Sequence, residues 1–239
     1  MAGQRLRYRR GRRPRTRPAA TATATATFVQ PRAAIRSGNA FGRLLVGELR
    51  ILVRGVSPWW WLGVAALATA GLLIPGDAVV GPLLLATCVW PVLIWSRLGT
   101  QHQEHGVDTL TGAYPARRRR LLAEWTAGVV LTALVGLAPA VRMVLATDWA
   151  AVAGWGAGTL LVPSLALGLG VLSRTHRLFQ VVYLPLWYGV ANDIAALDFI
   201  GAVRVDGRPV GPHPLAVLGI AAVMVGSAFV VASVRHRRR

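Results

Sequence analysis

The polar side chains best suited to chemistry gather in one segment of the chain, residues 97–121. It contains His102, Glu104, His105 and Asp108, all side chains that could bind a metal ion. Their order is H-Q-E-H, whereas the hydrolase motif H-E-x-x-H sets two imidazoles on one helical face with a general base between them. No third metal ligand at a suitable spacing was identified. We therefore expect no metal site, and we interpret the segment as a solvated helix that faces a partner.

A serine and a histidine suggest a second chemistry, serine hydrolysis within a membrane. Ser164 and His213 lie in separate apolar segments, in the chain order that such a pair would need. The serine stands in the run Val-Pro-Ser-Leu, without the glycines that open backbone N–H groups to an oxyanion. The histidine lies at the very start of its segment. We expect no catalysis by this pair.

The use of cysteine and lysine excludes further chemistries. The one cysteine, Cys88, lies in an apolar run, so neither a disulfide framework nor a cysteine-based metal site is available. All 27 basic residues are arginine. The phosphate-binding motif G-x-x-x-x-G-K-[ST] requires a lysine, so the chain does not contain it. We expect no catalytic residue, cofactor or metal here, and any ATP hydrolysis must belong to another subunit.

The apolar residues are grouped in blocks that approach the thickness of a bilayer. The chain is 54% hydrophobic and 15% charged, whereas soluble domains have about 25% charged residues. A helix needs about 20 apolar residues to cross a bilayer. We predict an all-α membrane protein with six transmembrane helices, at residues 59–75, 79–95, 122–144, 149–172, 178–191 and 214–234.

The region before the first predicted span has two parts. Residues 1–37 are rich in arginine and contain a Thr-Ala repeat, which predicts a disordered cytoplasmic tail. Residues 38–56 have helical periodicity, with Arg43, Arg50 and Arg54 on one stripe and leucines opposite. A basic amphipathic helix of this kind is expected to lie in the membrane interface. The alternative is a cytosolic helix that packs on a soluble partner.

Two features, one after the fifth span and one within the fourth, leave questions open. The span 178–191 is short, so residues 192–203 are predicted to form a re-entrant or interfacial segment, which is tolerated where protein shields its backbone. Gly154 and Gly158 form a G-x-x-x-G pair, which lets helix backbones approach closely. This pair serves either packing within one bundle or contact between two copies.

The distribution of arginine predicts the orientation in the membrane. The outer loops contain only Arg142, Arg204 and Arg208, diluted by aspartates, if the N-terminus is cytoplasmic. This asymmetry follows the positive-inside rule and predicts that both termini are cytoplasmic, in the plasma membrane. It also accounts for the net charge of +18, so we expect no nucleic acid as a partner. The arginines then inside are the tail residues, Arg97, Arg117 to Arg120, Arg174, Arg177, Arg235 and Arg237 to Arg239.

The segment QEHGVDTLTGAYPARRRRLLAEW resembles the cytoplasmic loop of the membrane subunits of type-2 ATP-binding-cassette exporters. In that family an acidic residue precedes a Gly-Thr-Leu-like helix, and a proline and basic residues then lead into the third span. The chain departs from this pattern by inserting Val107-Asp108 before Thr109. Residues 39–55 and 177–203 resemble the family's N-terminal helix and its fifth span, and the resemblance covers roughly residues 39–236. The loop counterparts are Glu104, Gly106, Asp108 to Leu110, Pro115 and Arg117 to Arg120.

The resemblance implies a permease subunit that forms the transmembrane pathway of an ATP-driven exporter. A short helix within residues 101–114 would couple it to a separate ATPase subunit, and a second permease half, identical or homologous, would complete the transporter. The alternatives are an ion-coupled secondary transporter and a non-transporting scaffold or sensor. Ionisable residues are scarce in the spans, which disfavours ion coupling. The coupling residues that the resemblance implies are Glu104, His105, Gly106, Asp108, Thr109 and Leu110.

Overall fold

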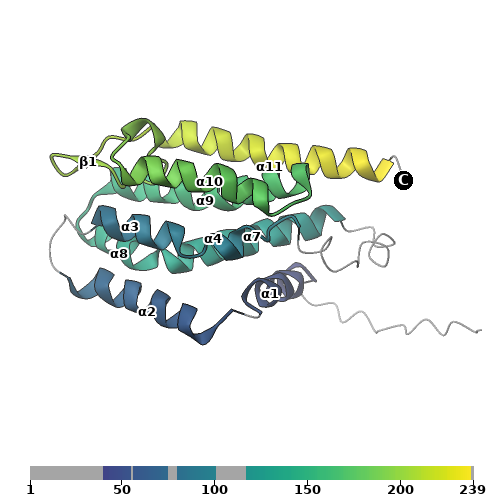
Figure 1. The fold of residues 1–239 in the computed structure, drawn as a ribbon, viewed down its shortest axis with the longest axis horizontal. Coiled ribbons are helices and arrows are strands. Elements are labelled where there is room, and N and C mark those ends of the chain that lie inside the picture. Colours follow the sequence, from purple (N-terminus) through teal and green to yellow (C-terminus); the bar gives the residue numbers. More distant parts are fainter. Residues whose placement is uncertain (1–39, 55, 75–79, 101–116, 238–239) are drawn as a thin grey trace, which may run out of the picture. The chain divides into compact units, whose positions relative to one another are not determined.

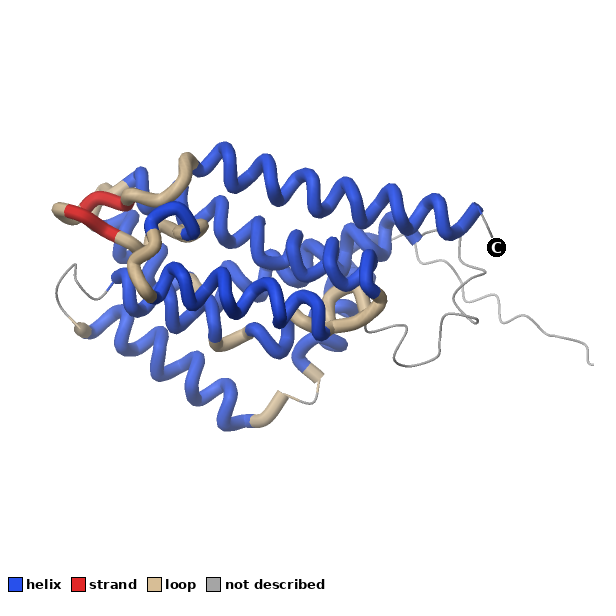
Figure 2. The backbone as a smooth tube through the Cα atoms, turned by 45° about the horizontal axis from the view of Figure 1, so that its top comes forward, coloured by secondary structure: helices blue, strands red, loops and turns tan. Residues whose placement is uncertain are grey.

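The computed structural model describes residues 40–54, 56–74, 80–100 and 117–237, which are almost entirely helical (Figures 1 and 2). All described residues belong to one compact unit, Gly38–Arg239. The predicted disordered tail, residues 1–37, therefore lies outside the described residues. The all-α prediction is confirmed for the described part, apart from one short β-hairpin.

The first two helices begin and end where local sequence signals indicate. Helix α1 spans Ala40–Val53 and helix α2 spans Pro58–Leu73. The Ser57 hydroxyl accepts the Trp59 N–H and caps α2, whose first residue is a proline, a position where the missing N–H costs nothing. Helix α2 ends directly before Ile74 and Pro75, because the residue before a proline disfavours helical backbone.

The predicted span 79–95 is two helices rather than one. Helix α3 covers Val80–Val89 and the short helix α4 covers Val92–Trp95. Pro91 lies between them, and its ring and missing N–H interrupt the helical ladder. The backbone beyond α4 continues in tight turns to Thr100, which is 1% exposed.

The predicted span 122–144 bends sharply near its middle. Helix α7, Arg117–Val135, and helix α8, Leu137–Leu145, meet at 61°. The bend lies at Gly136, and Pro139 follows in the first turn of α8. A proline at that position cannot donate to the carbonyl four residues earlier, so the ladder breaks there. A Cβ at Gly136 would lie 2.7 Å from the Trp155 Nε1, so the bend packs closely on the next helix.

The two longest apolar helices, α9 and α11, lie side by side along much of their length (Figure 1). Helix α9 covers Trp149–Ser173 and helix α11 covers Pro214–Arg237. Gly168 allows the close approach, since a Cβ there would lie 3.0 Å from the Met224 carbonyl oxygen. Most of α9 is buried in the bundle, whereas α11 is largely exposed. Exposed apolar helix surface of this kind suits contact with lipid.

Helix α10, Arg177–Ala191, is fastened to α3 by two hydrogen bonds from aromatic side chains. The Tyr183 hydroxyl donates to the Cys88 carbonyl at 2.8 Å, and the Trp187 indole donates to the Leu85 carbonyl at 2.9 Å. Both acceptors are main-chain oxygens of α3. The aromatic side chains therefore set how α10 lies along α3, and Cys88 itself is buried and forms no disulfide.

A short irregular segment and a hairpin connect α10 to α11. The 3₁₀ turn η2 covers Ala195–Leu197, and strands β1, Arg204–Val205, and β2, Arg208–Pro209, pair antiparallel. The hairpin turn is Asp206-Gly207, with φ of 51° and 76°. Positive φ at both turn residues is the geometry that an Asp-Gly pair favours in two-residue hairpins.

The segment predicted as re-entrant or interfacial, 192–203, returns into the fold from Asp198 onward. Phe199 and Ile200 are 4% and 1% exposed, and the backbone of the segment packs on α9. The segment packs closely against Gly154 and Gly158. A Cβ at Gly158 would lie 2.8 Å from the Phe199 carbonyl oxygen. The structure therefore uses the G-x-x-x-G pair for packing within the chain.

The described residues contain two helices that are individually long and apolar enough to cross a membrane, Trp149–Ser173 and Pro214–Arg235. Two bent pairs reach the same length when each is counted together: residues 41–53 with 58–73, and 118–135 with 137–145. The described part of the chain thus has two to four candidate membrane spans. Helices α3 and α10 are shorter, and the count of six remains a prediction.

Candidate functional site

The predicted coupling residues lie in a segment, 101–116, that is outside the described residues. The structure does describe both of its ends. Thr100 is buried directly before it, and Arg117 directly after it begins α7. The surroundings of these two ends form the candidate site, which we call the loop junction: residues 97–100, the first two turns of α7, and the part of α1 that packs on them. The residues outside are Glu104, His105, Gly106, Asp108, Thr109 and Leu110.

A buried carboxylate fixes the entry to the loop. The Glu124 side chain is 2% exposed, and its Oε1 accepts the N–H of Gly99. A charged acceptor makes such a bond stronger than a neutral one. Gly99 has φ of +78°, and a Cβ there would lie 3.0 Å from the Leu167 carbonyl oxygen of α9. Glycine is therefore required at this turn by both backbone conformation and space.

A second buried carboxylate ties α1 to α7. The Glu48 side chain is 5% exposed, and its Oε1 lies 3.5 Å from the Arg120 Nε. Burying a carboxylate is costly unless it is paired, so this contact favours one rotation of α1 about its axis. Leu52, one turn further along α1, is 1% exposed on the same face. The predicted amphipathic helix therefore places its apolar face against its own chain.

The end of α9 completes the junction. The Arg235 guanidinium of α11 donates to the carbonyls of Val171 and Leu172, at 2.6 and 3.1 Å, in the last turn of α9. Cations at a helix C-terminus interact favourably with its unpaired carbonyls. Gly170 lies against the Leu98 carbonyl oxygen. Polar contacts thus join α7 to Gly99 and α1 to α7, α9 lies directly against residues 98 and 99, and α11 contacts the end of α9.

The residues that the serine-hydrolysis hypothesis considered have other partners. The Ser164 hydroxyl is fully buried, donates to the Leu160 carbonyl at 2.6 Å and accepts the Trp125 indole N–H at 2.9 Å. His213 is exposed at the start of α11, where its Nδ1 accepts the Leu215 N–H. The contacts of neither side chain prepare the serine for attack on a carbonyl.

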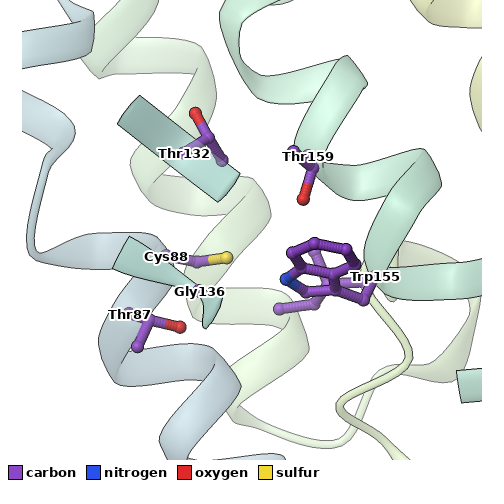
Figure 3. A pocket seen from close by; sticks show the side chains of 7 residues that line it. Thr87, Cys88, Thr132, Gly136, Trp155 and Thr159 are labelled. Carbon is purple, nitrogen blue, oxygen red and sulfur yellow. The ribbon is translucent and has the colours of Figure 1, made fainter. Parts of the chain in front are cut away.

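A small cavity lies between α3, α7, α9 and the segment after α10 (Figure 3). Its volume is about 10 Å³, which is close to the minimum that one water molecule needs. In Figure 3 the Cys88 sulfur and the Trp155 indole point toward each other across it. The Thr132 hydroxyl donates to the Gly128 carbonyl at 2.8 Å. A cavity of this size holds no transported substrate. Its lining is Thr87, Cys88, Thr132, Gly136, Trp155, Thr159 and Ile200.

Within the described ranges, no three His, Cys, Asp or Glu side chains come together to hold a metal ion. The residues of the metal hypothesis, His102, Glu104, His105 and Asp108, lie outside those ranges. The loop junction contains one ion pair with a buried carboxylate, a hydrogen bond from Gly99 to a second buried carboxylate, and close backbone contacts.

Sequence reasoning missed the residues that build the junction. Glu48 carried a signal, because it is the one acidic residue between 38 and 56 and its position falls among the leucines of the apolar face. Glu124 is one of the few ionisable residues in the predicted spans, and this position by itself does not indicate a contact with Gly99. Gly99 carried no local signal, because its role depends on contact with α9, about 70 residues away in sequence. Periodicity reports only on neighbouring residues, so it cannot reveal a contact over that separation.

We expect Glu124→Ala to lower the free energy of unfolding by about 1–3 kcal/mol, because the buried Gly99 N–H loses its acceptor. Glu124→Gln keeps a carbonyl oxygen at the same distance along the side chain, so its loss should be smaller. Titration of SDS into detergent micelles that contain the purified chain measures both. If the two variants lose the same amount of stability, the acceptor role of Glu124 is wrong.

Comparisons of this chain with protein-family models, with curated proteins and with solved structures found no match.

Proposed function

We propose that this chain is the permease subunit of an ATP-driven exporter of the type-2 ATP-binding-cassette kind. It crosses the plasma membrane six times with both termini in the cytoplasm, works with a separate ATPase subunit and pairs with a second permease half. The chain performs no covalent chemistry in this proposal. Its work is to change the exposure of a transmembrane pathway when the ATPase subunit changes shape.

The positions of the arginines support the proposed orientation. Helix α9 has 25 residues, which corresponds to a length of about 37 Å, enough to cross the hydrocarbon core. Arg235 contacts the last turn of α9, whereas Arg204 pairs with Asp148 at its first turn, at 3.0 Å. The two arginines were assigned to the inner and outer side respectively, and they lie at opposite ends of one helix.

The loop junction is the observation that carries the proposal. A partner that moves the loop 101–116 would pull on Thr100 and Arg117, the described residues at its two ends. Through Gly99 this displacement reaches Glu124 of α7, and through Arg120 it reaches Glu48 of α1. Packed helices transmit strain because protein interiors have low compressibility. The junction thus provides a short mechanical route from a cytoplasmic partner into the bundle.

Co-purification tests the proposal directly. A tagged chain extracted in mild detergent from its own cells should bring with it a subunit that hydrolyses ATP and contains the lysine motif this chain lacks. We expect Glu104→Ala and Leu110→Ala to reduce the co-purified ATPase by about tenfold, the effect of losing about 1.4 kcal/mol of association energy. Membrane insertion should be unchanged. Gln103→Ala, beside Glu104, serves as the matched control and should have no effect.

Two results would contradict the proposal, and they separate its alternatives. Transport by the purified chain alone, abolished when the proton gradient is collapsed, would identify an ion-coupled carrier. Absence of both an ATPase partner and any transport would favour a scaffold or sensor. Six spans can be tested separately by labelling cysteines introduced at positions 77, 110, 206 and 237, of which only 77 and 206 should react from outside.

A further inference from the structure

The exposed face of α1 is basic along its whole length. Leu52 and Glu48 face α7, and on the opposite face Arg43 and Arg50 are exposed, with exposed Arg54 just beyond the helix end. Spacings of seven and four residues set these three arginines in one row. At 1.5 Å per residue the row is about 16 Å long. We call this row the arginine stripe.

The angle between α1 and the other helices determines which way the arginine stripe faces. Residues 41–53 and 58–73 form helices whose axes differ by 103°. Figure 1 accordingly shows α1 nearly end-on while α2, α7 and α9 run across the view. A helix perpendicular to the spanning helices runs parallel to the membrane surface. Because α1 packs sideways on α7, its opposite face points away from the bundle.

Exposed apolar side chains border the arginine stripe on both sides. Val46 is 56% exposed and Ile51 is 43% exposed, and they lie on the two flanks between the basic face and the buried face. A helix at the membrane surface needs an apolar flank against the acyl chains and a charged face at headgroup depth. This arrangement supplies both.

Among the described residues around the arginine stripe, basic side chains outnumber acidic ones. The one acidic residue of α1, Glu48, lies on the buried face near Arg120. Arg118 and Arg119, in the first turn of α7, are exposed. A guanidinium binds phosphate oxygens through paired N–H donors and stays ionised at every physiological pH. Phosphodiester groups with a net negative charge therefore complement this surface.

We propose that Arg43, Arg50 and Arg54 bind the headgroups of anionic phospholipids in the leaflet at the loop-junction end of the chain. The binding orients α1 along the membrane surface and stabilises the junction that α1 forms with α7. The inference requires only a membrane location, so it stands or falls independently of the exporter proposal.

Native mass spectrometry of the full-length chain, released from nanodiscs with equal phosphatidylglycerol and phosphatidylcholine, tests the inference. The wild-type chain should retain phosphatidylglycerol preferentially. Each Arg→Gln change in the arginine stripe should weaken this retention by about fivefold, the effect of one surface arginine near anionic lipid. The triple variant Arg43→Gln, Arg50→Gln, Arg54→Gln should lose the preference.

A charge-matched control separates specific from general attraction. The double variant Arg174→Gln, Arg177→Gln removes two other exposed arginines assigned to the same side. It should keep more of the preference than the matched double variant Arg50→Gln, Arg54→Gln. The single variant Arg50→Gln gives a second measurement if the triple variant fails to fold. Equal loss in the control variant, or an unchanged preference in the stripe variants, overturns the inference. So does a stripe that binds only an acidic protein and no lipid.

Discussion

Replacing Asp198 by alanine is expected to lower the free energy of unfolding by about 3–5 kcal/mol, because three buried backbone donors lose one shared acceptor. The Asp198 carboxylate is 2% exposed. Its Oδ1 accepts the N–H groups of Ile200 and Ala202 at 3.2 and 3.0 Å, and its Oδ2 accepts the N–H of Val203 at 2.8 Å. These donors belong to irregular backbone inside the fold, where water cannot replace the lost acceptor.

The variant Asp198→Asn is the matched comparison. Its amide oxygen can still accept from Ile200 and Ala202, whereas its NH₂ group would face the N–H of Val203. We therefore expect a loss of about 1–2 kcal/mol, between wild type and alanine. SDS titration into detergent micelles measures all three proteins. A loss below about 1 kcal/mol for Asp198→Ala would mean that this carboxylate does not hold the segment 199–203 in place.

Replacing Gly158 by leucine is expected to produce the second large loss, about 3 kcal/mol or more. A Cβ at this position would lie 2.3 Å from the Ile200 Cγ2 and 2.8 Å from the Phe199 carbonyl oxygen. The second contact is with backbone, so a rotamer change cannot relieve it. Overpacking of this kind typically costs about 1–3 kcal/mol for a few atoms and more where the backbone must move.

Gly156→Leu provides the control on the same helix. A Cβ at Gly156 would have no neighbour within 4 Å. Both substitutions gain the same helix propensity over glycine, about 1 kcal/mol, so the difference between them isolates the clash with the segment 199–201. Gly156→Leu should be neutral or stabilising by SDS titration. Similar stability of the two variants would contradict the packing of Gly158 against that segment.

These two predictions concern one structural device, the re-entry of residues 198–203 into the bundle. Asp198 satisfies the backbone donors, and Gly154 and Gly158 make the space on α9. Irregular backbone at membrane depth is tolerated only where its polar groups are satisfied and protein shields it. The sequence places Asp198 among the aspartates of a predicted outer loop, a position that does not indicate burial.

The positions of the helices could largely be predicted from the sequence. Each of the six apolar segments coincides with described helix, and the stripe of Arg43, Arg50 and Arg54 opposite the leucines is present in α1. These features depend on local composition and on periodicity near 3.6 residues, which one stretch of chain expresses by itself. Pro75 and Pro91 also mark the helix ends through their own backbone chemistry.

The amino-acid sequence alone determined an all-α chain whose apolar blocks suit a membrane and whose arginines are unevenly distributed. Only the tertiary structure decided that the face of α1 opposite its arginines packs on α7, that Gly158 serves packing within the chain, and that Glu124 holds Gly99. Each of these depends on a partner far away in sequence. The type of a residue does not indicate which distant surface its side chain will contact, because that contact depends on how the whole bundle packs.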